Sequence, residues 1–255
     1  MGRVMGGGVR PVLRKIWLRQ FLLQGCWNYE GMQNVGFAYC MLPALREQYK
    51  GRPEELIRAL KRHLEFFNTH PAMAGVVLGA SVRLEERVAE GEADPRAIGT
   101  FKVGLMGSLG AIGDSYFWGA LKPMAAAAGA ILSLVHPLLG IAALLLLYNV
   151  SHLAIRYRGF VAGTEGEERA ARFLRGEGLA RKTEDRKLVA AILGGAYAGV
   201  IGSRTALMFG GIATAAAVLV VAALLVHLFS TFFRKAVSPS ELLLFLLVVG
   251  TLTLW

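Results

Sequence analysis

Three short polar or glycine-rich stretches interrupt an otherwise apolar chain, and they hold the side chains that could do chemistry. They are Gln24–Asn34, Asn68–Pro71 and Gly104–Trp118. Their carboxylates, amides and hydroxyls are groups that hydrogen-bond the hydroxyls of a small solute. We find no nucleophile paired with a base and no Cys/His cluster with metal-ligand spacing. The chemistry these residues suggest is therefore binding, without a metal or a cofactor.

We expect a hydroxylated solute to meet these polar stretches and not the long apolar ones. Glu30 and Gln33 are three residues apart and would share one face of a helix, with Asn34 four residues from Glu30. The alternative is that the polar groups only satisfy one another and the backbone of broken helices. The candidate substrate-binding residues are Glu30, Gln33, Asn34, Asn68, Thr69 and Asp114, with Gln24, Asn28 and His70 as further possibilities.

Glycine recurs at every third residue from Gly104 to Gly113, directly before Asp114. This spacing thins one flank of a helix, so that another backbone can approach or the helix can break. Asp114 stands in apolar surroundings, where a carboxylate is costly, and three roles are open to it. It could cap the amino end of the next helix, contact the substrate, or pair with a basic side chain. The stretch is not a phosphate-binding loop, because no Gly-Lys-Ser/Thr follows it.

The histidines are expected to be structural. His70 could act as a base, but no Ser or Cys nucleophile is placed to use it. His136 and His152 lie in apolar sequence without partners of catalytic spacing. Hydrogen-bonded structural roles are the simpler interpretation for all three.

The composition places the elements that hold these residues in a membrane. Of 255 residues, 55% are apolar and 18% charged, and the mean hydropathy is +0.48. These values exclude a disordered chain, and two cysteines exclude a secreted disulfide scaffold. The net charge of +10 suits cytoplasmic loops and anionic lipid head groups. No aromatic-basic recognition motif accompanies it, so we expect no nucleic-acid partner.

Two uncharged runs are long enough to cross a bilayer. The run 123–155 is interrupted at His136-Pro137, which predicts either one long kinked helix or a hairpin. The run 205–233 is the clearest transmembrane helix. Shorter apolar segments cover 188–203 and 242–255.

Two other stretches are expected at the edge of the membrane. The apolar run 72–82 is too short to span, which predicts a re-entrant segment unwound at Pro71. Residues 44–67 predict an amphipathic helix with a helix start at Pro53. That helix lies either on the lipid surface or against the rest of the protein. Its apolar stripe is Leu56, Leu60 and Leu64, flanked by Ile57 and Phe67.

Basic blocks at 1–19, 156–187 and 234–235 predict the topology. Lys and Arg concentrate on the cytoplasmic side of membrane proteins. We therefore expect the amino end inside and the last apolar segment running outward.

The polar stretches carry a resemblance to a known family. The segments Gln24–Tyr39 (QGCWNYEGMQNVGFAY), Phe66–Pro71 (FFNTHP), Gly104–Trp118 (GLMGSLGAIGDSYFW) and Tyr148–Gly159 (YNVSHLAIRYRG) resemble the IID component of mannose-family phosphotransferase systems. The resemblance implies a bacterial inner-membrane subunit that forms the sugar pathway with a IIC subunit. It also implies soluble IIA and IIB partners that carry the phosphoryl group, larger oligomers of IIC–IID pairs, and a IID chain that is not itself phosphorylated.

The sequence as a whole predicts an all-α, polytopic membrane protein with re-entrant or broken helices and amphipathic surface helices. We expect one IID membrane domain over 1–255. Its parts are an amphipathic part over 1–97, a glycine-rich block with an apolar hairpin or kinked helix over 98–155, a cytoplasmic polar segment over 156–187, and transmembrane helices over 188–255. The alternative function is a regulatory membrane protein of the same fold without transport.

Overall fold

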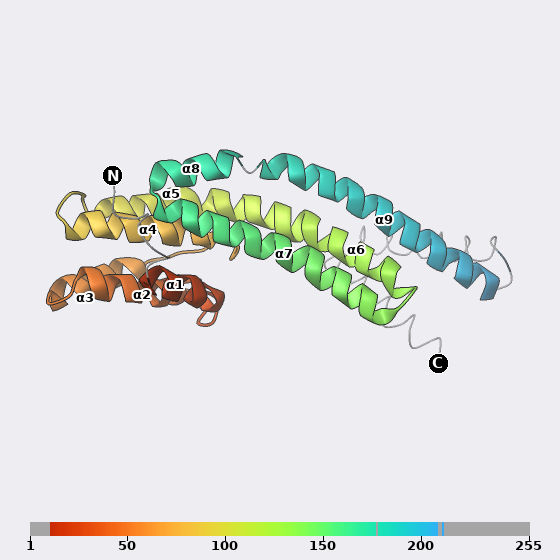
Figure 1. Ribbon diagram of the computed structural model, residues 1–255, viewed down its shortest axis with the longest axis horizontal. Helices are drawn as coiled ribbons and strands as arrows, with labels where there is room; N and C mark the ends of the chain where they lie inside the picture. The colour runs from red at the N-terminus through yellow and green to blue at the C-terminus, as the bar shows by residue number, and fades with distance from the viewer. Residues whose placement is uncertain (1–10, 177, 209–210, 212–255) are drawn as a thin grey trace, which may run out of the picture. The chain divides into compact units, whose positions relative to one another are not determined.

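The computed structural model describes residues 11–176, 178–208 and 211, in two compact units that divide between Gly194 and Gly195. Helices dominate the described residues (Figure 1), which confirms the all-α expectation there. Outside them, the described backbone forms two isolated bridges, Asn28 with Met32 and Met32 with Phe67. The α-helices are α1 (Pro11–Arg19), α2 (Asn34–Gln48), α3 (Pro53–His63), α4 (Ala74–Ala89), α5 (Arg96–Gly113), α6 (Lys122–Ser133), α7 (Pro137–Thr164), α8 (Glu167–Gly176) and α9 (Leu179–Met208). A 3₁₀ turn, η1 (Gln20–Leu22), follows α1, and a π-helical segment, η2 (Asp114–Leu121), joins α5 to α6.

The apolar run 123–155 forms a hairpin, so the hairpin alternative is the one the structure adopts. Helices α6 and α7 lie side by side (Figure 1) and are joined by a turn that ends at His136. The backbone of His136 is extended, and its Nδ1 accepts a hydrogen bond from the amide of Leu138 at 3.2 Å, which caps α7. The two helices approach closely because a Cβ on Gly129 would lie only 2.9 Å from the carbonyl oxygen of Gly140.

Helix α7 is, among the described residues, the one helix long and apolar enough to cross a membrane. Its 28 residues extend about 42 Å, and only 11% of its most apolar window is buried inside the protein. A soluble core helix would be mostly buried, so this exposed apolar surface fits a lipid or protein partner. The predicted segment 188–203 lies within α9. The predicted span 205–233 overlaps the last turn of α9 and includes the described Gly211, but its other residues lie, like 242–255, outside the described residues.

Helices α4 and α7 cross with their backbones in contact. Gly75 and Gly79 on α4 and Gly159 and Gly163 on α7 each stand four residues apart. A Cβ on Gly79 would lie 2.4 Å from a carbonyl oxygen of α7, and a Cβ on Gly163 would lie 2.4 Å from one of α4. Such paired small residues let membrane helices pack at short range. This crossing holds α7 against α4 in the unit that ends at Gly194.

The apolar run 72–82 differs from the predicted re-entrant segment. Residues 68–71 are unwound as expected, but the run continues as regular helix through Arg83 and Glu85 to the end of α4. Every residue from Ala74 to Ser81 is buried, because α2, α5 and α7 surround the helix. Protein contacts therefore account for the apolar character of this run.

The predicted amphipathic helix over 44–67 is two elements and not one. A turn at Gly51, whose φ is +78°, separates the end of α2 from α3, which begins at Pro53 as expected. Leu56 and Leu60 pack on the core. The helix ends at His63, so Leu64 falls outside the stripe and is 43% exposed.

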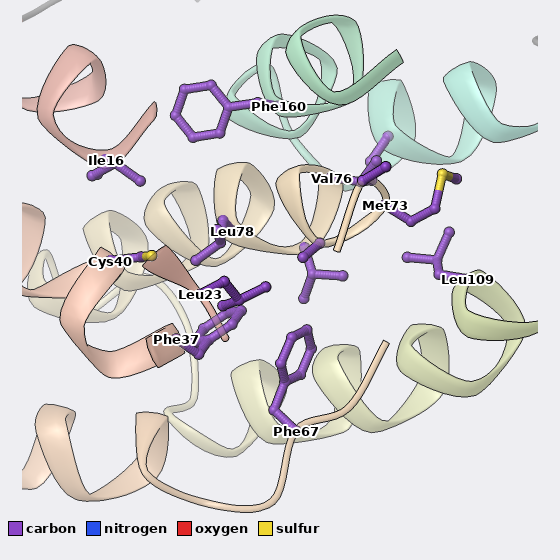
Figure 2. Packing of buried hydrophobic residues seen from close by; sticks show 14 of the residues in the cluster. Ile16, Leu23, Phe37, Cys40, Phe67, Met73, Val76, Leu78, Leu109 and Phe160 are labelled. Carbon is purple, nitrogen blue, oxygen red and sulfur yellow. The ribbon is translucent and has the colours of Figure 1, made fainter. Parts of the chain in front are cut away.

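The main core joins the amino-terminal helices to α4, α5 and α7. Figure 2 shows Phe37 from α2, Phe67 and Leu109 among the buried side chains of this cluster. Phe37 and Phe67 are fully buried, with ring centroids 4.5 Å apart. Phe67 directly precedes the polar residues 68–71, so the core anchors one of the three polar stretches.

Candidate functional site

The first and second polar stretches are joined by a reciprocal pair of hydrogen bonds. The Nε2 of Gln33 donates to the carbonyl oxygen of Thr69 at 2.7 Å, and the amide of Thr69 donates to the Oε1 of Gln33 at 3.2 Å. Gln33 is 2% exposed and Thr69 5% exposed. A buried amide that satisfies a non-helical backbone in this way holds two chain segments in register.

The glycine-rich stretch packs directly on the second polar stretch. A Cβ on Gly113 would lie 2.3 Å from the Cβ of His70, and a Cβ on Gly110 would lie 3.8 Å from the Cα of Thr69. The ring of His70 stacks on Phe117, with centroids 4.7 Å apart and an interplanar angle of 9°. The three stretches, far apart in sequence, thus lie together in the fold.

The first polar stretch is a turn, and this corrects the expected helical face shared by Glu30, Gln33 and Asn34. Met32 adopts a φ of 57°, and α2 begins only at Asn34. Asn28 closes the turn, since its Oδ1 accepts from the Gly31 amide at 2.8 Å and its Nδ2 donates to the Oδ1 of Asn34 at 3.1 Å. Asn34 in turn donates to the carbonyl oxygen of Leu64 at 2.7 Å. Asn28, Gln33 and Asn34 are therefore committed to protein contacts.

Four other candidates keep exposed side chains. Glu30, Asn68, Asp114 and Gln24 are all exposed, and none of them makes a side-chain hydrogen bond or ion pair with the described part of the chain. Asp114 does not cap a helix, which corrects one of its three expected roles. It lies inside a continuous helix, at the first residue of η2, and a π-helical widening of this kind often accompanies a functional site.

Two of the candidates are buried with unused polar atoms. The Oγ1 of Thr69 and the Nε2 of His70 have no hydrogen-bond partner. The Nδ1 of His70 accepts from the amide of Ala72 at 3.2 Å, which supports the turn at Pro71. One ring nitrogen of His70, Nδ1, therefore has a structural hydrogen bond, and the other, Nε2, has no partner.

A buried ionic cluster that the sequence analysis did not anticipate joins α2, α3 and α4. The carboxylate of Glu85, which is fully buried, accepts from Arg62 at 2.6 Å and 2.8 Å and from the hydroxyl of Tyr49 at 2.7 Å. The Nε2 of His63 lies 2.9 Å from the same carboxylate. Nearby, the Nζ of Lys102 donates to the carbonyl oxygen of Arg62 at 3.1 Å.

The cluster has a consistent electrostatic pattern. Burial alone would raise the pKa of Glu85, but hydrogen bonds from Arg62, His63 and Tyr49 outweigh it and lower the pKa to about 2. Burial lowers the pKa of His63, so the ring is neutral and donates to Glu85. Burial and the bond to Glu85 raise the pKa of Tyr49, which keeps its proton. These groups form a closed structural network, not a reactive centre.

The cluster escaped sequence analysis because nothing in the pattern marks Glu85 as different from its neighbours. It stands in the charged run Arg83–Arg87, which is typical of a solvated helix face. Glu85 and Arg62 are 23 residues apart in the chain, so the sequence does not show that they form an ion pair.

Within the described ranges no three His, Cys, Asp or Glu side chains gather as a metal site would require. Cys26 is exposed and Cys40 buried, and both are free thiols.

Solved structures share this fold. One, described as the mannose transporter ManYZ in complex with microcin E492, aligns with a TM-score of 0.60 and 30% identity over 96% of both chains. Another, described as a membrane protein, aligns with a TM-score of 0.66 and 40% identity over 74% of this chain and 69% of that one.

Curated relatives give the same picture. The mannose-specific EIID component of Escherichia coli K12 is 45% identical over 152 residues, which is 59% of this chain and 54% of that one. The fructose permease IID component of Bacillus subtilis is 34% identical over 182 residues, 71% and 66% of the two chains. The aligned region spans about half the length of the first of these relatives and about two thirds of the second.

The family model for the IID component of the mannose/fructose/sorbose phosphotransferase system matches residues 10–255, nearly the whole chain. The match includes all three polar stretches and the helices that bring them together. This chain therefore belongs to the IID family of mannose/fructose/sorbose phosphotransferase systems.

Proposed function

We propose that this chain is the IID membrane subunit of a phosphoenolpyruvate-dependent sugar transporter. With a IIC subunit it forms the translocation pathway for a mannose-type hexose, which a IIB protein phosphorylates with a phosphoryl group received from IIA. The chain is not phosphorylated and has no catalytic role of its own. It is a multi-pass protein of the bacterial inner membrane. Its family membership and its likeness to a chain of a mannose transporter support this proposal.

The observation that carries the proposal is the convergence of the three polar stretches. Gln33 locks the first stretch to Thr69, and Gly113 lets the glycine-rich helix reach His70. These contacts hold the three stretches together, while the exposed side chains of Glu30, Asn68 and Asp114 keep no partner within the described part of the chain. A hexose offers several hydroxyls, each of which needs a donor or an acceptor.

We propose that some of the candidate residues bind the sugar and that the others position them. Glu30, Asn68 and Asp114 are exposed and free of intrachain bonds, so they are the groups that meet the sugar. Gln33, Asn34 and Thr69 are engaged with protein atoms and position the stretches that carry them. Hydrogen bonds to a charged group are worth about 1.5–3 kcal/mol, against about 1 kcal/mol for neutral ones, so Glu30 and Asp114 dominate the affinity.

The IIC subunit packs on the exposed flank of α5. Gly104 and Gly107 lie on this flank, and no atom of the described chain lies within 4 Å of where their Cβ atoms would stand. Ser108 and Ala111 continue the same exposed, small-residue surface. In a bilayer, such a surface allows a partner helix to approach closely. The exposed leucines of α7 face lipid or further IIC–IID pairs.

The transport role is tested by deleting the gene in its own host and measuring hexose uptake. We expect uptake and intracellular hexose phosphate to fall, and plasmid-borne parent chain to restore both. Unchanged uptake would contradict transport and favour a regulatory role.

The site is tested separately, by sugar binding to purified IIC–IID complex. We expect Glu30→Gln, Asn68→Ala and Asp114→Asn each to weaken hexose binding by about tenfold or more while the complex still assembles. Glu92→Gln, an exposed acid in the turn after α4, is the matched control and should bind as the parent does. If all three variants bind like the parent, the site assignment is wrong even where uptake requires the chain.

A further inference from the structure

A polar cavity lies in the unit that ends at Gly194, and its lining includes none of the exposed groups assigned to the sugar. Its volume is about 240 Å³, and it lies between the chain just after α1, the turn at residues 70–71, η2 and the middle of α7. Three aromatic side chains form part of its wall, namely Phe21, Trp118 and Tyr148. Its polar lining comes from Gln20, Gln24, His70, His152 and Arg156.

Three of these polar side chains are more than nine-tenths buried and have unused hydrogen-bonding atoms. Gln20 is fully buried, and neither its Nε2 nor its Oε1 has a partner. His70 is 2% exposed with an unpartnered Nε2, and Arg156 is 5% exposed with an unpartnered Nε. Folded proteins rarely leave such atoms unsatisfied, and three around one cavity indicate an occupant.

The charge of the cavity indicates what kind of occupant it takes. Arg156 donates through Nη2 to the carbonyl oxygen of Gln20, and its guanidinium lies 4.5 Å from the centre of the Phe21 ring. It forms no ion pair with the described part of the chain, and none of the residues that line the cavity is Asp or Glu. A buried guanidinium without a counter-ion is unfavourable, above all on a membrane helix such as α7. An anion would satisfy it.

We propose that this cavity binds a phosphate group, with Arg156 as the charged ligand and the side chains of Gln20 and His70 as hydrogen-bond donors. A guanidinium fits the fork geometry of phosphate oxygens. The volume also admits the small polar portion of the molecule that carries the phosphate, against the aromatic wall. The phosphate belongs either to a soluble hexose phosphate or to a phospholipid head group, and the two sources share the same recognition chemistry. This site goes beyond the proposed transport role, and its test rests on that proposal only for the IIC subunit with which the chain is purified.

The test uses purified IIC–IID complex in detergent, freed of phospholipid. Binding of inorganic phosphate and of glucose 6-phosphate is measured by calorimetry, and binding of lipid by native mass spectrometry after incubation with phosphatidylglycerol or with a neutral glycolipid. We expect a phosphate-bearing probe to bind the parent, and Arg156→Gln to weaken that binding by about tenfold or more. Arg158→Gln, which removes the same charge two residues further along α7 from an exposed position, should bind as the parent does.

Gln20→Glu tests the phosphate site in a second way, in case the Arg156→Gln chain does not assemble with IIC. A carboxylate at this position supplies Arg156 with an internal counter-ion, so we expect a complex at least as heat-stable as the parent that no longer binds phosphate. Binding of glucose 6-phosphate or inorganic phosphate supports the soluble source, and binding of phosphatidylglycerol alone supports the lipid source. The proposal is overturned if no phosphate-bearing probe binds, if Gln20→Glu binds as the parent does, or if a carboxylate of the IIC subunit occupies the cavity in the assembled complex. None of these measurements involves hexose uptake, so a negative result here would not contradict the proposed transport role.

Discussion

The side chain of Gln33 replaces a strand partner for the backbone of Thr69, accepting from its amide and donating to its carbonyl oxygen. Both groups are buried, so each bond lost leaves a desolvated polar atom without a partner. The pair therefore stabilises the contact between two polar stretches through residues that are 36 positions apart in the chain.

Replacing Gln33 with Leu should destabilise the protein by about 2–4 kcal/mol, since two buried backbone groups lose their partner. Gln33→Glu should cost at least as much at neutral pH, because it buries a charge and sets a carboxylate oxygen against the Thr69 carbonyl oxygen, to which the Gln33 amide donates. The measurement is thermal unfolding of the purified complex followed by fluorescence. Glu30→Gln is the control in the same turn and should stay within about 0.5 kcal/mol of the parent. Equal stability of Gln33→Leu and the parent would show that the pair contributes nothing.

Two glycines of one helix should respond in opposite ways to the same substitution. Gly113→Ala places a Cβ 2.3 Å from the Cβ of His70 and should destabilise the protein by about 1–3 kcal/mol through overpacking. Gly107→Ala meets no atom of the described chain within 4 Å. In the isolated chain it should therefore be neutral or stabilise by up to about 1 kcal/mol.

The same pair of variants also probes the partner surface. If the IIC subunit covers the flank of α5 at Gly107, then Gly107→Ala should weaken co-purification of IIC although the chain itself is no less stable. Thermal unfolding of the chain alone and the yield of IIC on an affinity-tagged chain separate the two effects. Intact co-purification with Gly107→Ala would place the IIC contact elsewhere.

Much of the architecture follows from local sequence. The interruption at His136-Pro137 marks the hairpin, since Pro fixes φ at the first helical position and the preceding residue favours extended backbone. Pro53 marks the start of α3 for the same reason. The extent of α3 was predicted less well, because Leu64 continues the apolar spacing although the helix has ended at His63.

The candidate site was predicted in composition but not in geometry. Glu30 and Gln33 have helical spacing, yet the left-handed backbone of Met32 puts them in a turn, and only Gln33 points into the protein. Asp114 resembles a helix cap next to glycine, but the helix passes through it as a π-helical widening. In both cases contacts with distant residues override the local pattern, and a single sequence does not reveal such contacts. The sequence also did not predict the glycine pairs of α4 and α7 as a helix contact. Each pair is an ordinary four-residue spacing, and its role is visible only when the two helices are seen to cross.

The topology predicts which exposed residues face the cytoplasm. Arg172 on α8 is exposed and belongs to the basic segment 156–187, which is expected inside. Lys61 is exposed on α3, which is also rich in Lys and Arg, so we expect that helix to face the cytoplasm as well. Single cysteines at these positions, in a background without Cys26 and Cys40, should resist a membrane-impermeant thiol reagent in intact cells and react after lysis. Labelling of either cysteine in intact cells would invert the topology.

The ionic cluster at Glu85 should make the protein sensitive to acid. The pKa of Glu85 is lowered from 4.5 in a free carboxyl to about 2, so its contribution is complete above pH 4.5 and is lost as the pH falls from there towards 2. The difference corresponds to about 3 kcal/mol at neutral pH. The lowered pKa of His63 acts in the same direction, because protonation below pH 6.5 favours the unfolded chain. The free energy of unfolding should therefore begin to fall below pH 6.5 and fall more steeply below 4.5.

Glu85→Gln tests the origin of this dependence. The amide is nearly isosteric but leaves the largely covered guanidinium of Arg62 without its counter-ion, so we expect a loss of about 3–5 kcal/mol at pH 7 together with a flatter profile between pH 4.5 and 2. Glu54→Gln on α3 is the control, since its exposed pair with Arg58 is 3.9 Å long and contributes little. Chemical unfolding followed by circular dichroism across this pH range checks both variants. A Glu85→Gln profile as steep as that of the parent would assign the acid sensitivity to other groups and leave the cluster with a packing role only.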